Sequence, residues 1–494
     1  MSRLSRPILL ALGAMLLAGC DGGADDGVVD VAFIGNSDSP FASGLRLGPA
    51  AQHVRAATAE GLVSLNEQGE IVPGLAESWI VTDDGLSYIF RLRNTQWPDG
   101  SRVTGQSARD ALIATRRQLI GTSLGHDLAK VDAVLAMAGR VIEIRLQSPM
   151  PDLLQLLAQP ELGLRQDGQG IGPMTMRREG DIAMLGALPP SRRGLPENPN
   201  WEEDYRQVTL RALPVEQALA AFAQGKVEVV LGGTLANLPL ADTGPLSRGT
   251  VRLDPALGLF GLRVTAKDGM LADAELREAL AMAIDRSDLL VPFNIAGWSP
   301  ATRLAAPSQL IGEQIAPERW TNQAIEDRRG VARRRILTWR AANDRRGNEP
   351  LPLTIALPQG PGAELLLREL NADFEAIGIV LQRAEAGTRP DLRLVDRVAR
   401  FPGLRWYLNQ FNCALDNGAC STVADDLVAE ASMASDAQQR TALLAQAEAA
   451  LVDANAYIPL GSPVRWSLVR GQIDGFVENP WNLHPLFPLA QRPI

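Results

Sequence analysis

A β-α-β pattern that occurs twice, far apart in the chain, places the strongest constraint on the fold. In the first copy, apolar strand patterns cover residues 208–213 and 227–231. Between them, Pro214 suits the start of a helix and Gly225 suits the residue just past its end. The second copy repeats the order of strand, amphipathic helix, glycine and strand over residues 353–382. Because each unit needs its own sheet environment, two such units indicate an α/β protein of two lobes.

Other local patterns add a hairpin and further helices. Apolar residues alternate with polar ones at 79–81 and 86–92, on either side of Asp83-Asp84-Gly85. This arrangement predicts a β-hairpin. Apolar stripes at 276–284 and 443–451 have the spacing of helices that bury one face. We expect these stripes to be core.

Size and charge exclude several classes of protein. The chain has 494 residues, of which 46% are hydrophobic, and this is enough for two or three globular domains, each with its own hydrophobic core. Its formal net charge is −9, so a surface that follows a nucleic-acid backbone is not expected. We therefore expect no nucleic-acid partner.

The N-terminus has the pattern of an export signal. Arg3 and Arg6 precede a run of mostly apolar residues at 7–19, which is too short to span a bilayer as a mature helix. The run ends in Leu-Ala-Gly before Cys20, which resembles a bacterial lipobox and predicts lipid attachment to Cys20. Asp21 resembles the signal that keeps such lipoproteins at the inner membrane. The alternative is an ordinary signal peptide that happens to contain a cysteine.

Two cysteines remain, and their spacing suggests a disulfide. Cys413 and Cys420 flank a turn-like Asp-Asn-Gly segment, and an even pair in an exported protein favours a disulfide over a metal site. The alternative is two buried free thiols.

Familiar catalytic and cofactor motifs are missing from the sequence. It contains no Gly-Lys-Ser/Thr phosphate loop, no dinucleotide-binding glycine pattern, no Gly-x-Ser-x-Gly and no His-Glu-x-x-His. The three histidines, His53, His126 and His484, are scattered. We therefore expect no enzyme, no cofactor and no metal site.

A colinear series of segments resembles one known family. The signature region includes Gly-Leu-Ala-Glu-Ser-Trp at 74–79 and Trp-Pro-Asp-Gly at 97–100. These segments resemble the family 5 extracellular solute-binding proteins, the oligopeptide, dipeptide and nickel-binding receptors of ABC importers. Further matching segments follow in order over nearly the whole mature chain: 61–63, 84–93, 103–104, 170–173, 220–229, 276–286, 440–460 and 475–480.

The resemblance implies an α/β, two-lobed periplasmic-binding-protein fold with an extra domain, mixed sheets and a hinge between the lobes. It implies crossover strands near 258–268 and 462–472. The expected division is a signal peptide, a tether, a discontinuous domain I, an extra domain II and a domain III that forms the second lobe. Their bounds are 1–19 for the signal, 20–27 for the tether, 28–55 with 168–262 and 470–494 for domain I, 56–167 for domain II and 263–469 for domain III.

The resemblance also implies candidate ligand contacts. In peptide-binding relatives, an aspartate after a strand of the later domain meets the amino terminus of the peptide, with an arginine nearby. Asp396 and Arg397 are the candidates here, although Asp396 is shifted from the familiar position, and a surface turn pair is the alternative. The other candidates are Asn36 and Ser37 after the first strand, Phe260 at the first crossover, and Trp406. For the two aromatic residues, core packing is the alternative.

The resemblance predicts a protein that binds a ligand and does not catalyse a reaction. We expect a monomeric, lipid-anchored periplasmic receptor that captures a short peptide or similar small polar solute between its lobes and delivers it to ABC permease subunits. Nickel chelates or haem are alternative ligands. A periplasmic enzyme or sensor that uses the same fold without transport is the alternative function.

Overall fold

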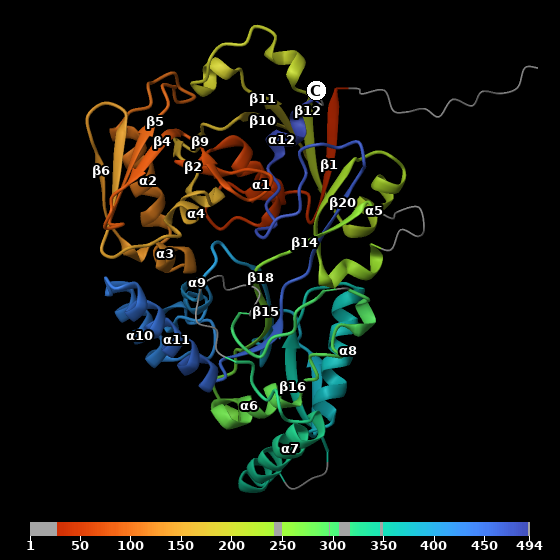
Figure 1. Ribbon diagram of the computed structural model, residues 1–494. Helices are drawn as coiled ribbons and strands as arrows, with labels where there is room; N and C mark the ends of the chain where they lie inside the picture. Colours follow the sequence, from red (N-terminus) through yellow and green to blue (C-terminus); the bar gives the residue numbers. More distant parts are fainter. Residues whose placement is uncertain (1–26, 242–248, 296, 306–316, 346–348, 493–494) are drawn as a thin grey trace, which may run out of the picture.

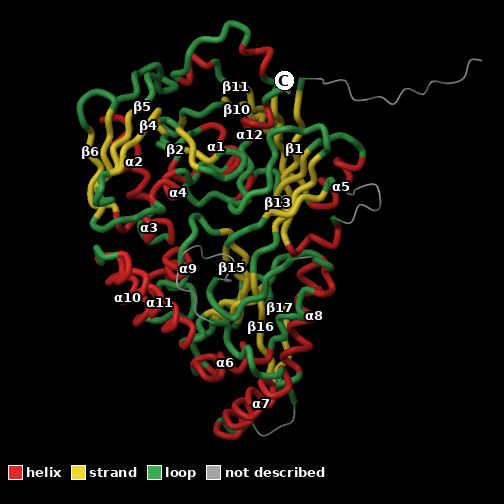
Figure 2. Tube along the Cα trace, viewed as in Figure 1, coloured by secondary structure: helices red, strands yellow, loops and turns green. Residues whose placement is uncertain are grey.

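Three sheets organise the computed structural model, which describes residues 27–241, 249–295, 297–305, 317–345 and 349–492. Figure 1 shows the seven-stranded sheet and the four-stranded sheet side by side in an upper lobe, with the five-stranded sheet in a lower lobe. The same separation is visible in the trace of Figure 2. The structure therefore has two lobes, and the upper one carries an additional sheet.

The seven-stranded sheet draws its strands from well-separated parts of the chain. β1 pairs in parallel with both β12 and β13, and α5 (Val215–Ala223) connects the latter two. The predicted first β-α-β unit is thus present, with β1 between its two strands. In sheet order the strands are β10 (Met174–Glu179), β11 (Ile182–Ala187), β12 (Gln207–Leu213), β1 (Val28–Ile34), β13 (Val229–Thr234), β20 (Arg465–Val469) and β14 (Val251–Asp254).

The five-stranded sheet contains the second predicted β-α-β unit. Its strands β16 and β17 are parallel neighbours joined by α8 (Pro361–Glu375), whose buried face includes Leu366, Leu370 and Phe374. The sheet order is β17 (Ile379–Arg383), β16 (Leu351–Ala356), β18 (Leu392–Val398), β15 (Gly258–Val264) and β19 (Tyr457–Gly461).

The four-stranded sheet holds the predicted hairpin. β4 and β5 pair in an antiparallel register that joins Trp79 to Phe90, as the alternating pattern predicts. The order is β4 (Ala76–Val81), β5 (Ser87–Leu92), β7 (Val141–Leu146) and β6 (Val131–Ala136). Two small two-stranded sheets complete the set: β2 (Val63–Leu65) with β3 (Ile71–Pro73), and β8 (Arg165–Gln166) with β9 (Gln169–Gly170).

The helices cover these sheets and link the lobes. The largest hydrophobic cluster contains residues of the four-stranded sheet and of α9, α10 and α11, so it extends from one lobe into the other. The helices are α1 (Pro49–Thr58), α2 (Gly105–Gln118), α3 (Ser123–Asp127), α4 (Leu153–Leu157), α5 (Val215–Ala223), α6 (Ala274–Ala283), α7 (Ile325–Ala342), α8 (Pro361–Glu375), α9 (Leu404–Asn409), α10 (Thr422–Met433), α11 (Ala437–Asp453) and α12 (Leu486–Ala490).

Two short passages carry the chain between the large sheets. β14 and β15 are separated by residues 255–257, and β19 and β20 are separated by residues 462–464. The two passages run side by side, because β14 pairs with β20 at one end and β15 pairs with β19 at the other. The family resemblance implies crossovers near 258–268 and 462–472, but β15 already belongs to the second sheet and β20 to the first.

Each passage contains a proline. Pro255 and Pro463 lie in the two passages, and a proline has no N–H to donate to a strand ladder. Sequence periodicity could not place these points, because β15 is buried along its whole length and would look the same in either sheet.

Candidate functional site

A cleft of about 660 Å³ lies between the two lobes. The upper lobe contributes residues from the segment before α1 and from α1 itself, from the turn before α3, and from 159–161. The lower lobe contributes residues 396–400 and the loop that contains Leu415 and Asn417. The volume is in the range of small-molecule sites, which typically measure about 300–1,000 Å³.

The end of β18 delivers charged side chains to this cleft. Asp396 and Arg397 belong to β18, and Arg400 follows two residues after the strand ends. Asp396 is paired rather than free: its Oδ1 atom lies 2.7 Å from Nη1 of Arg465 in β20. Both side chains are largely buried. Because β18 and β20 belong to different large sheets, the ion pair connects the sheet of one lobe to the sheet of the other.

The side chain of Arg397 lines the cleft and is accessible to solvent there, while protein atoms surround it on its other sides. Burial lowers the pKa of Arg397, and the like charge of Arg400 lowers it further, whereas Asp127 acts in the opposite direction. The Arg397 Nη1 atom donates to Oε1 of Gln410 at 2.5 Å. Because this acceptor is neutral, the positive charge of Arg397 faces the cleft without a bonded carboxylate among the described residues.

Glu161 is the other acidic residue of the cleft wall, and its side chain is 3% exposed. Its Oε1 atom accepts a hydrogen bond from Nε2 of Gln52 at 2.9 Å and lies 3.9 Å from Nη2 of Arg400. Glu161 therefore balances part of the charge of Arg400 from the opposite wall.

Further polar contacts cross between the lobes beside the cleft. The Nε2 atom of Gln159 donates to the backbone oxygen of Arg400 at 3.1 Å. A second contact joins α3 to α9, where Oδ1 of Asp127 accepts a hydrogen bond from Nδ2 of Asn409 at 2.8 Å. Burial raises the pKa of Asp127, while the nearby Arg405 and Arg400 lower it. These contacts bring the two lobes together around the cleft.

The structure brings some of the predicted site residues together. Asp396 and Arg397 both line the cleft and both lie in a strand, so a surface turn does not describe them. Phe260 is directly opposite Asp396 in the β15–β18 register, but its side chain is fully buried in the core of the lower lobe. Trp406 is also fully buried, and it packs edge-on against Tyr407. Core packing, the alternative, therefore describes both aromatic residues.

Asn36 and Ser37 are exposed in the turn after β1, and neither is among the residues that line the cleft.

Sequence reasoning missed three charged residues of the cleft, Arg465, Arg400 and Glu161. The available signal for Arg465 was a charged residue within an otherwise apolar crossover segment. Arg400 lies in the segment just after β18, close to Asp396, the acidic ligand contact that the family resemblance implies.

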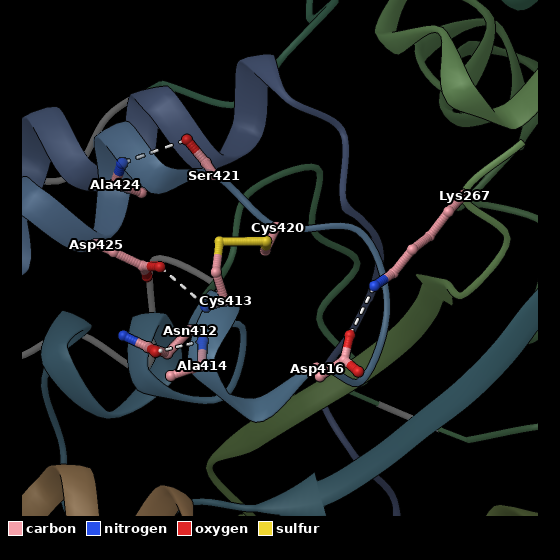
Figure 3. Close-up of a disulfide and its surroundings, with 9 residues drawn as sticks. All are labelled: Lys267, Asn412, Cys413, Ala414, Asp416, Cys420, Ser421, Ala424 and Asp425. Carbon is pink, nitrogen blue, oxygen red and sulfur yellow. Dashed lines mark hydrogen bonds and ion pairs between the residues drawn. A yellow bond between two sulfur atoms is a disulfide. The ribbon is translucent and has the colours of Figure 1, made fainter.

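The predicted disulfide is present in the structure (Figure 3). Cys413 and Cys420 are bonded, with their Cα atoms 5.3 Å apart. The Oδ2 atom of Asp425 accepts a hydrogen bond from the Cys413 backbone N–H at 2.9 Å. On the far side of the loop, Lys267 Nζ lies 2.6 Å from Oδ1 of Asp416. The loop that carries the cleft residues Leu415 and Asn417 is therefore held at both sides.

Cys20 and the predicted signal lie outside the described residues. Within the described ranges, no helix has the length and apolar character needed to cross a membrane. Across those same ranges, no cluster of three or more histidine, cysteine or acidic side chains could hold a metal ion.

A smaller cavity of about 250 Å³ lies wholly within the upper lobe, near the ends of α1 and α12. Glu60 and Arg93 contribute charged groups to it, and burial raises the pKa of Glu60. None of its lining residues comes from the five-stranded sheet, so a ligand there would not bridge the lobes.

The three sheets, the paired passages and the cleft define a two-lobed protein of the peptide-binding-protein fold. The crystal structure of Haemophilus influenzae OppA in complex with the peptide RPPGFSPFR superposes with a TM-score of 0.78 at 19% identity, and covers 95% of this chain and 99% of that one. At this identity the likeness establishes the fold.

Sequence comparisons find the same similarity. Residues 70–179 match the bacterial extracellular solute-binding proteins, family 5 middle. The probable di/tripeptide-binding protein 5 of Pseudomonas aeruginosa is 23% identical over 459 residues, which cover 84% of this chain and 86% of that protein. The periplasmic murein peptide-binding protein MppA of Escherichia coli is 27% identical over 266 residues, which cover 46% of this chain and 47% of MppA. The resemblance to the family 5 solute-binding proteins is thereby confirmed.

Proposed function

We propose that this protein is a substrate-binding lipoprotein of an ABC importer that captures a short peptide or similar small polar solute in the interlobe cleft. The observation that carries the proposal is the cleft itself, because its walls come from both lobes and its volume suits a small molecule. The similar proteins are named as peptide-binding proteins, which supports the same ligand class.

The three sheets correspond to three proposed domains, with the two passages at 255–257 and 462–464 as the hinge. A ligand that contacts both walls would stabilise the closed arrangement of the lobes, and the closed form is what the permease subunits would recognise. Because both passages are short and adjacent, rotation about them needs few backbone changes.

The lipid on Cys20 is the proposed membrane anchor, on the periplasmic face of the inner membrane. An anchored receptor is held near its permease, and the anchor raises the effective concentration of the closed complex there. A single chain provides both walls of the cleft, so a monomer suffices.

Mass spectrometry of the freshly purified full chain tests this proposal. We expect a small molecule that stays bound under native conditions, is released on unfolding, and has the same mass after prolonged incubation with the protein. A released molecule that is converted to a product would favour the alternative, an enzyme on the same fold. The absence of any bound solute, together with no binding of short peptides, would contradict the receptor function.

A further inference from the structure

The first step concerns the carboxylate of Asp396. A receptor that recognises a free amino group needs an acidic side chain available in its cleft, because a buried ammonium needs an opposite charge. Asp396 is already bound to Arg465 at 2.7 Å, and Nη2 of Arg465 also donates to the Asp396 backbone oxygen at 3.4 Å. A ligand ammonium group at Asp396 would therefore have to share the carboxylate with Arg465, whose positive charge would repel it.

The second step concerns Glu161. Its Oε1 atom is shared between Gln52 and Arg400. Its Oε2 atom is shut off from solvent and has no hydrogen-bond partner among the described residues. A ligand in the cleft therefore cannot reach this oxygen without moving the wall.

The third step is the charge of the cleft. Its described lining contains four arginines, Arg46, Arg397, Arg400 and Arg465, against two acidic residues, Asp396 and Glu161. The lining therefore carries an excess of two positive charges, whereas the chain as a whole carries −9. Arg397 faces this space with only a neutral side chain as its bonded partner in the described structure.

We propose that the cleft selects its ligand through an anionic group, a carboxylate in the case of a peptide, held by Arg397 with Arg400 beside it, and that a free amino group is dispensable. An anion entering the cleft would regain in charge-assisted hydrogen bonds what it loses in hydration. An ammonium group would meet two arginines, and both acidic side chains of the described lining are already paired with an arginine, so it stays toward solvent. This inference rests on the proposed function and specifies the ligand class for the same cleft.

Three forms of one tripeptide test the inference on the unmodified full chain in detergent. Calorimetry would compare trialanine, N-acetyl-trialanine, which lacks the amino charge, and trialanine amide, which lacks the carboxylate. We expect the first two to bind with dissociation constants within a few fold of each other, and the amide to bind about tenfold or more weakly, as the loss of a charged hydrogen bond requires.

Each outcome has a separate meaning. Loss of binding on acetylation, with the amide unaffected, would overturn the inference and leave the peptide-binding function intact. Equal binding of all three forms would also overturn the inference, because no charged end would then be selected. No binding of any form would contradict the peptide-binding function itself, and the inference would fall with it.

Substitutions then locate the anion. Arg397→Gln should weaken the binding of trialanine about tenfold and leave the weak binding of trialanine amide nearly unchanged. Arg393→Gln is the matched control, since Arg393 is an exposed arginine of the same strand that does not line the cleft. An Arg397→Gln protein that melts like the parent but still distinguishes trialanine from its amide would overturn the assignment.

Discussion

Arg465 and Asp396 form an ion pair that joins the two large sheets, with Nη1 and Oδ1 separated by 2.7 Å. Arg465 opens β20 directly after one interlobe passage, and Asp396 lies near the end of β18 at the cleft. The pair therefore connects the proposed hinge to the proposed binding site.

A double-mutant cycle measures this connection. Asp396→Asn should lower the free energy of unfolding by about 2 kcal/mol, because a largely buried guanidinium loses its charged partner. Arg465→Gln should have a similar effect, and the double variant should lose much less than the sum of the two. Urea unfolding of the four proteins provides the values. Strictly additive losses would show that the two charges do not interact.

His53 is predicted to remain neutral at unusually low pH. Its Nδ1 atom lies 2.7 Å from the Pro49 oxygen, which can only accept, and its Nε2 atom accepts from the His484 backbone N–H at 3.1 Å. This arrangement fits a neutral ring with its hydrogen on Nδ1. Burial, followed by the nearby His484, lowers the pKa of His53 from 6.5 to about 4.

The sign of the resulting pH dependence follows from proton binding. Between about pH 6.5 and about pH 4, the unfolded chain takes up a proton at His53 and the folded chain does not. Folding stability should therefore be fully present above this window and decrease as the pH falls through it, by roughly 3 kcal/mol in total. NMR titration of the histidine ring signals, assigned with His53→Gln, checks the pKa. A His53 signal that titrates near pH 6.5 would refute the prediction.

The disulfide should contribute modestly to stability. It closes a loop of about eight residues, for which loop entropy predicts about 2.5 kcal/mol. The double variant Cys413→Ser/Cys420→Ser should unfold at a correspondingly lower urea concentration and still fold. As a direct check, iodoacetamide should modify neither cysteine in the native or unfolded protein until a reductant is added. Alkylation of both thiols without reductant would contradict the bond.

Lipid attachment should depend on Cys20 alone. Cys20→Ala is expected to abolish incorporation of labelled palmitate during expression, because the modified thiol is gone. The Cys413→Ser/Cys420→Ser variant serves as the control and should retain the label. Labelled Cys20→Ala protein would remove the lipobox interpretation and favour an ordinary signal peptide.

Local patterns in the sequence were sufficient for much of the fold. The hairpin of β4 and β5 and the unit formed by β16, α8 and β17 follow from alternation and helical spacing within short windows. The places where the chain changes sheets were harder to predict, because the apolar pattern of β15 is compatible with either sheet.

The cleft was harder to predict for a physical reason. Aromatic residues such as Phe260 and Trp406 suit a binding cleft or a core equally well, and only packing distinguishes the two. The charge pattern depends on pairs distant in sequence: Asp396 and Arg465 are 69 residues apart. A charged residue can be recognised from the sequence, whereas its partner cannot.

Ligand-dependent compaction is the most direct test of the receptor function. Small-angle scattering of residues 21–494 would be recorded with and without trialanine, at a concentration that calorimetry shows to be saturating. If the ligand bridges the two walls of the cleft, the radius of gyration should fall and the melting temperature should rise. A saturated protein whose radius of gyration and melting temperature both stay unchanged would contradict a cleft that closes on its ligand.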